Sequence, residues 1–593
     1  MRATIIVGLL AMAGRGVADT YPRPVGIKVS NYTFDISLND ANNEFVVQDT
    51  IDIRFVTAGV TGIDLDLCKF SAAVRAPQTS NGFLDPCAEP TGGRGGARSL
   101  PTGGKGMTVT DVNSGGQSLV FRHENDRLHI NLPRVFGAGE ELTFTVSYHG
   151  VPATGILIAN NKYGDRSFFS NPWPHKARNY LASFDHPSMK APVVTIVTAP
   201  RHYQVISNGR LAEQTDLPGD LRRTVWKESR PICTCLMSLG VASFAVDHFG
   251  QYHGIPLSSW VYPQEKEVSF KAFRAYTQPI LEFFIDHIGP YSYEKLAQVQ
   301  ANGINGGMEL ASDIYYGYGA NGAGRQLVAH EMAHQWFGDS AAEADWDDVW
   351  LSEGFATYFA LLYAEFQDGH DTFLEAVKRS KAQAIRYALE HPDSTIVHEN
   401  LADFSKVIAN NAQIYQGGAQ TLHNIRGVLG TKTFWAGIRL YYNRYQNGNA
   451  RTDDFRRSME EACRNAGDEC PADGKDLSWL FRELLSRGGV LQVQGSWRYD
   501  EAAKKVQVTL NQTQKSGLYR MPIELAITLK ETTETEGQPR RNETPEPQPV
   551  KHIRIMRLDQ QSQVFAFPVA REPISVALDP DAWVMMQATF ERK

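Results

Sequence analysis

The sequence lacks any basic stretch, and this absence argues against a nucleic-acid partner. Its 593 residues carry 59 Lys and Arg against 66 Asp and Glu, which gives a net charge of −7 with no run or stripe of positive side chains. Binding to nucleic acid depends on such residues because they neutralise phosphates, so we expect no nucleic-acid partner for this protein. At about 100 to 200 residues per domain, the length is enough for three or four domains.

Long hydrophobic runs are also missing beyond the first residues. Residues 1–18 read MRATIIVGLLAMAGRGVA, with one arginine, Arg2, ahead of an apolar run at 3–13 and small residues at Gly16 and Ala18. This pattern predicts a signal peptide cleaved after Ala18, although a buried first strand or helix is the alternative. The stretch is too short for a membrane anchor, and no later segment approaches the length of a membrane span. We expect a soluble mature protein exported to the periplasm or the extracellular space.

Cysteine is scarce, and no second CxxC-type pair exists that could build a zinc site from cysteines. Six cysteines fit an oxidising compartment without proving one. The two cysteines that bound CRNAGDEC at 463–470 enclose a short loop and are the preferred disulfide, and Cys68 and Cys87 could close another loop. Cys233 and Cys235 lie two apart on an expected strand, so they face one side and are poorly placed to bridge each other.

The hydrophobic periodicity divides the chain into three regions. Residues 19–257 alternate between apolar and polar side chains and predict a β domain, with a glycine-rich loop at 91–106. Residues 258–487 show mainly helical periodicity. Alternation returns in residues 488–593, which predict a β-sandwich with a polar loop at 531–549. The expected fold is therefore a multidomain α+β protein.

One short segment carries the pattern of a metal site. HEMAH at 330–334 places His330 and His334 one turn apart on one helix face, where both can bind a single zinc ion. Glu353 follows His334 after eighteen intervening residues, on a second helix rich in apolar side chains. An unpaired carboxylate is costly there, so we interpret Glu353 as the third ligand. Two histidines and one carboxylate leave a fourth position open, as in catalytic zinc sites.

Five segments together resemble the aminopeptidase N family of zinc metallopeptidases, whose pattern is HExxH with a glutamate eighteen residues later. They are ARNYLASFDHPSMKAP at 177–192, GGMEL at 306–310, HEMAHQWFGDS at 330–340, WDDVWLSEGFA at 346–356 and IYQGGAQTL at 414–422. The likeness runs from about residue 21 to the C-terminus. It implies a β-saddle domain, a thermolysin-like catalytic domain and a β-sandwich, in a short form without the family's helical C-terminal domain.

The resemblance also implies an activity, which is release of single N-terminal amino acids from peptides with one zinc ion per chain. The zinc would activate a water molecule, and Glu331 would accept the proton of that water. The family's catalytic tyrosine maps to Tyr415, which would donate a hydrogen bond to the oxyanion. The sequence predicts neither which N-terminal residue of a substrate is preferred nor the oligomeric state.

Selection of the N-terminus is expected from the segment just before the metal motif. A free α-amine is largely charged at neutral pH and needs an anionic partner when it leaves water, and Glu309 can be that partner. Gly306 and Gly307 would let an extended substrate backbone approach closely, with Met308 beside them. Fixing the amine at one distance from zinc would place only the first peptide bond of the substrate over the metal.

Some positions depart from the family pattern and leave other functions open. Leu310 replaces an asparagine, Gly417 replaces a lysine, and Asn171 and Trp173 stand where many members have Gln and Glu. These departures are expected near the substrate and away from the zinc. An epoxide hydrolase or an endopeptidase on the same zinc scaffold, and a metal-free binding protein, are the alternative functions.

Overall fold

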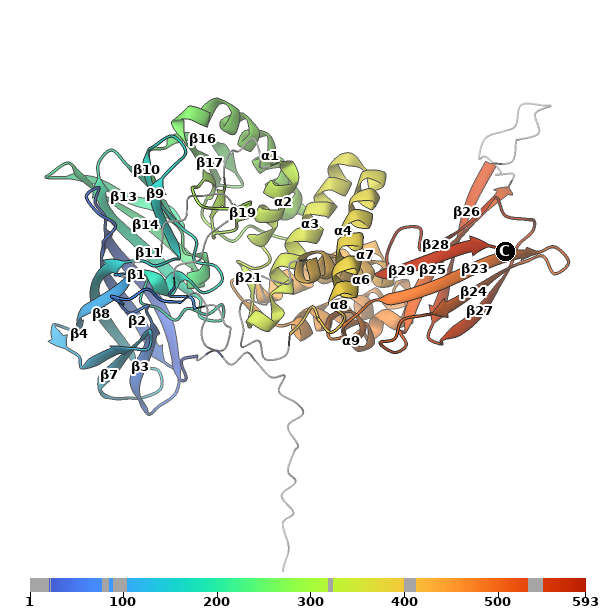
Figure 1. Cartoon of the computed structure of the whole chain (residues 1–593), viewed down its shortest axis with the longest axis horizontal. Coiled ribbons are helices and arrows are strands. Elements are labelled where there is room, and N and C mark those ends of the chain that lie inside the picture. The colour runs from blue at the N-terminus through green and yellow to red at the C-terminus, as the bar shows by residue number, and fades with distance from the viewer. Residues whose placement is uncertain are drawn as a thin grey trace, which may run out of the picture.

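The structure is a computed structural model that describes residues 21, 23–76, 85–88, 104–317, 324–398, 412–531 and 548–593. The expected signal peptide and most of the predicted loops at 91–106 and 531–549 lie outside these residues. The described chain forms three regions in a row: a β-rich region, a helical region and a second β region at the C-terminus (Figure 1). The predicted multidomain α+β fold class is therefore confirmed.

The N-terminal region contains three sheets. The largest has the order β13-β14-β11-β1-β2-β8-β4-β5, and the smaller ones have the orders β12-β15-β10-β9 and β3-β7-β6. The bounds are β1 Ile27–Ser37, β2 Phe45–Phe55, β3 Val60–Asp66, β4 Gly106–Ser114, β5 Gln117–Ser118, β6 Phe121–Glu124, β7 Arg127–Phe136, β8 Glu141–Val151, β9 Ile156–Asn160, β10 Arg166–Ser170, β11 Ala191–Pro200, β12 Gln204–Ser207, β13 Arg210–Leu217, β14 Leu221–Ile232 and β15 Leu239–Ala242. Apolar and polar residues alternate along these strands, so that one face of each is buried: Tyr32, Phe34 and Ile36 of β1 all point into the core.

A five-stranded sheet of order β16-β17-β18-β20-β19 leads into the helical region. Its strands are β16 Ala245–Tyr252, β17 Ile255–Val261, β18 Leu296–Gln300, β19 Gly307–Met308 and β20 Asp313–Tyr316. The expected domain boundary after residue 257 falls inside β17, which pairs in parallel with β18. Strand β19 pairs antiparallel with β20 at the sheet edge, and this pairing carries the GGMEL segment.

Helices form the centre of the molecule. Their bounds are α1 Lys266–His287, α2 Arg325–His334, α3 Trp350–Asp368, α4 His370–Glu390, α6 Gly418–Leu429, α7 Thr431–Tyr445, α8 Thr452–Ala466 and α9 Ser478–Leu485, and a π-helix, η5, spans Gln413–Gly417. Helix α3 packs against both α2 and α6. Two short parallel strands, β21 Ala341–Glu343 and β22 Gly448–Ala450, join the α2–α3 connection to the segment before α8.

Two sheets build the C-terminal region, with the orders β27-β24-β23-β29 and β26-β25-β28. Their strands are β23 Leu491–Asp500, β24 Lys505–Gln512, β25 Met521–Glu531, β26 Gln548–Leu558, β27 Ser562–Pro568, β28 Ser575–Leu578 and β29 Met586–Arg592. Leu510 of the first sheet and Leu525 of the second are both buried completely. The two sheets enclose one apolar interior, as the predicted β-sandwich requires.

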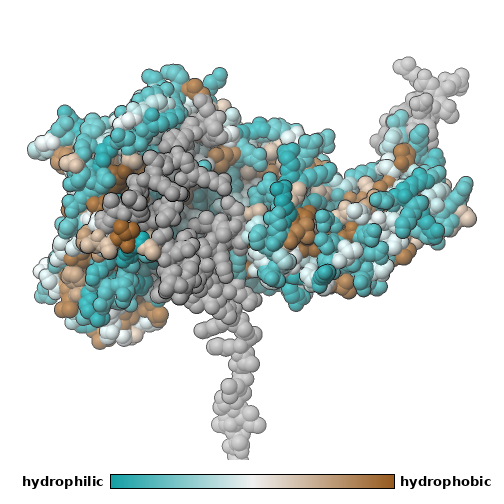
Figure 2. Space-filling view, in the orientation of Figure 1, coloured by the Kyte–Doolittle hydropathy of each residue, from teal (hydrophilic) through white to brown (hydrophobic). Residues whose placement is uncertain are grey.

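The visible surface is mostly hydrophilic, with small separate hydrophobic patches (Figure 2). Exposed large apolar side chains such as Val25, Val268 and Val564 belong to different elements. Among the helices of the described residues, none combines the length and the apolar character that crossing a membrane demands.

The structure contains three disulfides, and one of them corrects the sequence prediction. Cys68–Cys87 and Cys463–Cys470 are paired as expected. Cys233 and Cys235 are also paired, with their Cα atoms 5.3 Å apart. The prediction failed because β14 ends at Ile232, and the chain then tightens into a 3₁₀ turn instead of continuing as a strand. The turn brings the two Cα atoms into the range that a disulfide needs.

Candidate active site

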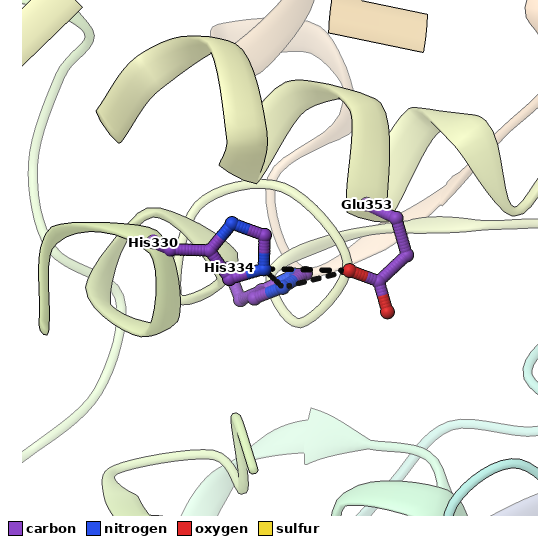
Figure 3. A group of neighbouring side chains, drawn as sticks. All are labelled: His330, His334 and Glu353. Carbon is purple, nitrogen blue, oxygen red and sulfur yellow. Dashed lines mark hydrogen bonds and ion pairs between the residues drawn. The ribbon is translucent and has the colours of Figure 1, made fainter. Parts of the chain in front are cut away.

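The three predicted metal ligands converge at the interface of two helices. His330 and His334 extend from α2, and the Glu353 carboxylate points toward both imidazoles from α3 (Figure 3). The two Nε2 atoms lie 3.2 Å apart, and they lie 3.5 and 3.3 Å from Glu353 Oε2. Glu353 stands in the first turn of α3, where the helix dipole favours a negative charge.

These three atoms fit a zinc ion. Tetrahedral coordination at about 2.0 to 2.1 Å places neighbouring ligand atoms about 3.3 Å apart, close to the separations in this cluster. Glu353 Oε2 is buried and has no hydrogen-bond donor. His334 Nδ1 lies 3.0 Å from the Ser352 hydroxyl and 3.3 Å from the Phe337 carbonyl oxygen, so its other nitrogen is oriented toward the cluster. A buried carboxylate oxygen and two converging imidazole nitrogens, that of His334 oriented by its neighbours, form a donor set that suits zinc.

Electrostatics favour a cation at this position. Burial raises the pKa of Glu309 and of Glu331, and the neighbouring carboxylates raise both further. Burial alone would lower the pKa of His334, but Glu309 and Glu353 outweigh it and raise that pKa. The pKa of Glu353 is instead lowered, because the two histidines overcome its burial. A divalent ion would relieve the repulsion among these carboxylates.

Glu331 lies beside the metal cluster, and the backbone of Gly307 approaches its carboxylate closely. Its side chain is 4% exposed, and a Cβ atom at Gly307 would lie 2.2 Å from Glu331 Cδ. Strand β19 therefore passes directly over the Glu331 carboxylate. Only a residue without a side chain allows this approach.

Glu309 follows β19 and lies at the His334 end of the cluster. It is 7% exposed, and its carboxylate groups with Glu331 and His334 so that one polar atom from each lies within 4.8 Å of the others. Gln335 Nε2 donates to the Glu309 carbonyl oxygen at 3.2 Å and fixes the backbone there. A buried carboxylate next to a metal site is suited to bind a cationic group.

Tyr415 lies on the opposite side, in the π-helix η5. Its hydroxyl donates to Glu353 Oε1 at 2.6 Å, and its ring is stacked 6.0 Å from the ring of His330. Helix α3 approaches this segment closely because glycines meet there: a Cβ atom on Gly354 would lie 2.8 Å from Gly418 Cα. Single-turn π-helices are frequent at functional sites, where they redirect one side chain.

The predicted site residues surround one cleft of about 730 Å³. Those that line it are Gly306, Gly307, Glu309, His330, Glu331, His334, Glu353 and Tyr415. Met308 is not part of this lining and packs against the core.

The structure adds lining residues that the sequence reasoning missed: Asn305, Gln326, Leu327, Thr357, Ala360, Gln383, Ala412 and Gln416. Helical spacing could have identified some of them, because Gln326 lies one turn before His330 and Thr357 one turn after Glu353. Gln383 comes from α4 and carries no signal in the sequence.

The four positions that depart from the family pattern are not among the residues that line the cleft. Leu310 and Gly417 are buried, and a Cβ atom on Gly417 would contact Ile396 at 3.2 Å. Trp173 packs edge-on against Trp346 at 6.1 Å, outside the cleft lining. Asn171 Oδ1 is buried without a hydrogen-bond donor and also lies outside that lining. Leu310 and Gly417 directly follow the lining residues Glu309 and Gln416, so their expected effect on substrate binding stays a prediction.

Comparison with known sequences gives matches over the N-terminal β region and over the helical region that contains the cleft. The model described as the peptidase M1 N-terminal domain matches residues 106–236, and the peptidase family M1 domain matches residues 276–483. Human glutamyl aminopeptidase is 28% identical over 310 residues, which cover 49% of this chain and 32% of the relative. The probable aminopeptidase 2 of Sulfurisphaera tokodaii is 24% identical over 472 residues, covering 72% of this chain and 55% of the relative. The chain thus spans about a third of the length of the glutamyl aminopeptidases that it matches.

Solved structures share the fold. An M1 zinc metallopeptidase from Deinococcus radiodurans is 21% identical, with a TM-score of 0.58, and the match covers 74% of this chain and 90% of that chain. A two-domain M1 zinc metallopeptidase bound to L-arginine is 21% identical, with a TM-score of 0.60, covering 76% and 93%. The solved structures that match are zinc metallopeptidases, and the donor set of His330, His334 and Glu353 in this chain suits the same metal. Because the two family models together cover more than half of its length, the chain belongs to peptidase family M1.

Proposed function

We propose that this protein is a zinc-dependent aminopeptidase that removes single residues from the N-terminus of peptides. The observation that carries the proposal is the position of Glu309, a buried carboxylate beside His334 at one end of the metal cluster. A carboxylate in this position would pair with the α-amine of a peptide and hold it at a fixed distance from the metal ligands. Only the first peptide bond would then lie over the cluster.

Zinc held by His330, His334 and Glu353 would lower the pKa of a water molecule and polarise the scissile carbonyl. Glu331, buried beside the cluster, would take the proton of the attacking water and deliver it to the leaving amine. The Tyr415 hydroxyl, which donates to Glu353 in this structure, would turn its hydrogen bond to the oxyanion that forms in the transition state.

The decisive test compares peptides that differ only at the N-terminus. Wild-type protein should hydrolyse a free-amine peptide from its first bond and refuse the N-acetylated peptide. Glu309→Ala should raise KM and lower kcat for the free amine, while zinc content stays at one ion per chain. Internal cuts in the acetylated peptide would show an endopeptidase and overturn the proposal.

We further propose that the mature chain is exported after cleavage of residues 1–18. Support comes from the three disulfides, because disulfides form and persist in oxidising compartments outside the cytosol. Intact mass of the protein recovered from the exported fraction tests this, and a mass that still includes residues 1–18 would contradict it.

A further inference from the structure

The cleft has a direction that follows from helix α2. His334, His330 and Gln326 are spaced four residues apart, so they occupy three successive turns of one helix face. Glu309 groups with His334 at one end of this row. Eight residues of helix separate Gln326 from that end, which is about 12 Å at 1.5 Å per residue. An extended peptide advances about 3.3 Å per residue, so Gln326 lies level with its third or fourth residue.

Three glutamine side chains line this cleft, and the elements that carry two of them, α4 and η5, pack against each other. Gln326 comes from α2, Gln383 from α4 and Gln416 from the π-helix η5, directly after Tyr415. Gln326 and Gln383 are exposed, and Gln416 is half-buried. Within the described residues, the side-chain amides of all three make no hydrogen bond to another protein group. Toward the described part of the chain, their donors and acceptors are therefore unused.

A carboxamide offers two N–H donors and a carbonyl acceptor, the same groups that a peptide main chain presents. Such side chains can bind a peptide backbone in both polarities and remain indifferent to the charge of the substrate's side chains. Thr357 and Ala360 of α3, which have small side chains, line the same cleft.

We propose that Gln326, Gln383 and Gln416 form a subsite for the peptide main chain beyond the scissile bond, and that they make this protein selective for oligopeptides over dipeptides. The proposal rests on the proposed aminopeptidase function, because the cleavage point sets which residues reach the glutamines. The N-terminal residue is held at Glu309, and the second to fourth residues pass between α2, α4 and η5.

The test measures kcat/KM for alanine peptides of two to five residues, each with a C-terminal amide so that no carboxylate is introduced. In the wild type, kcat/KM should rise about tenfold from the dipeptide to the tetrapeptide, since two net hydrogen bonds of ordinary strength produce an effect of that size. A tetrapeptide with an N-methyl group on its third residue lacks one main-chain donor and should lose part of this gain.

Variants assign the effect to the glutamines. In Gln326→Leu, Gln383→Leu and Gln416→Leu the side chain keeps a similar volume and loses its hydrogen bonds, and the ratio of tetrapeptide to dipeptide kcat/KM should fall toward one. Gln367→Leu is the matched control, because this exposed glutamine lies near the end of α3 and does not line the cleft. Its ratio should equal that of the wild type.

The outcomes separate this inference from the function on which it rests. Hydrolysis of an aminoacyl p-nitroanilide together with a flat length dependence leaves the aminopeptidase function intact and overturns the subsite. A wild-type ratio in all three glutamine variants overturns it as well. A protein that cleaves neither the anilide nor any peptide refutes the proposed function itself, and the subsite with it.

Discussion

Replacing Gly307 by alanine should disable Glu331 without touching the metal ligands. The added Cβ atom would lie 2.2 Å from both Cδ and Oε1 of Glu331, whereas ordinary contacts begin near 3.4 Å. The carboxylate must therefore move by about 1 Å, a displacement that can reduce turnover about 100-fold. This corresponds to about 2.7 kcal/mol of transition-state stabilisation. The backbone of Gly307 has no left-handed conformation that would add strain of its own.

The assay is hydrolysis of an aminoacyl p-nitroanilide, with kcat and KM determined separately and zinc measured in the same samples. We expect Gly307→Ala to lower kcat about 100-fold and to keep one zinc per chain. The Glu331→Ala background provides the control, because it removes both the base and the atoms that clash. In that background Gly307→Ala should cause little further loss. Wild-type kcat in the single variant, or an equal loss in both backgrounds, would refute the steric argument.

Other perturbations test the rest of the site. Tyr415→Phe should lower kcat by about two to three orders of magnitude, since oxyanion donors contribute about 2.7 to 4 kcal/mol elsewhere. A change in zinc affinity alone would limit Tyr415 to orienting Glu353. Gly354→Ala should push α3 away from Gly418 and cost about 1 to 3 kcal/mol of stability, which thermal melting measures. It should also speed the loss of zinc to a chelator, which metal competition measures. Removing zinc should abolish activity and lower Tm, and added zinc should restore both; an unchanged Tm would contradict the repulsion inferred among the buried carboxylates.

Much of the metal cluster could be predicted from the sequence because helical geometry is regular. The four-residue spacing of His330 and His334 fixes their common face, and the apolar surroundings of Glu353 identify a carboxylate that needs a partner. The alternating segments likewise predicted the β regions. These inferences depend on local spacing, which the folded chain preserves.

Other features depend on contacts between distant segments and leave no local pattern. The glutamine from α4 reaches the cleft only through packing of α4 beside α3 and η5. The proximity of Gly307 to Glu331 arises from the pairing of β19 with β20, which sets the height of the strand over α2. The Cys233–Cys235 disulfide was missed because a strand was assumed to continue through a turn.

The position of Glu353 likewise depends on contacts between segments that are distant in the sequence. Asp345, in the turn before α3, is fully buried and pairs with Arg23 from the N-terminal segment and with Arg451 from the start of α8. Asp348, one turn further along, accepts a hydrogen bond from the Thr452 hydroxyl at 2.6 Å. The start of the ligand helix is therefore fixed by residues more than 300 positions apart in the sequence. Spacing along the sequence identifies Glu353 as the third ligand. Its position in space depends on ion pairs that form only in the complete tertiary fold, because the buried carboxylate of Asp345 requires both arginines to offset its loss of water.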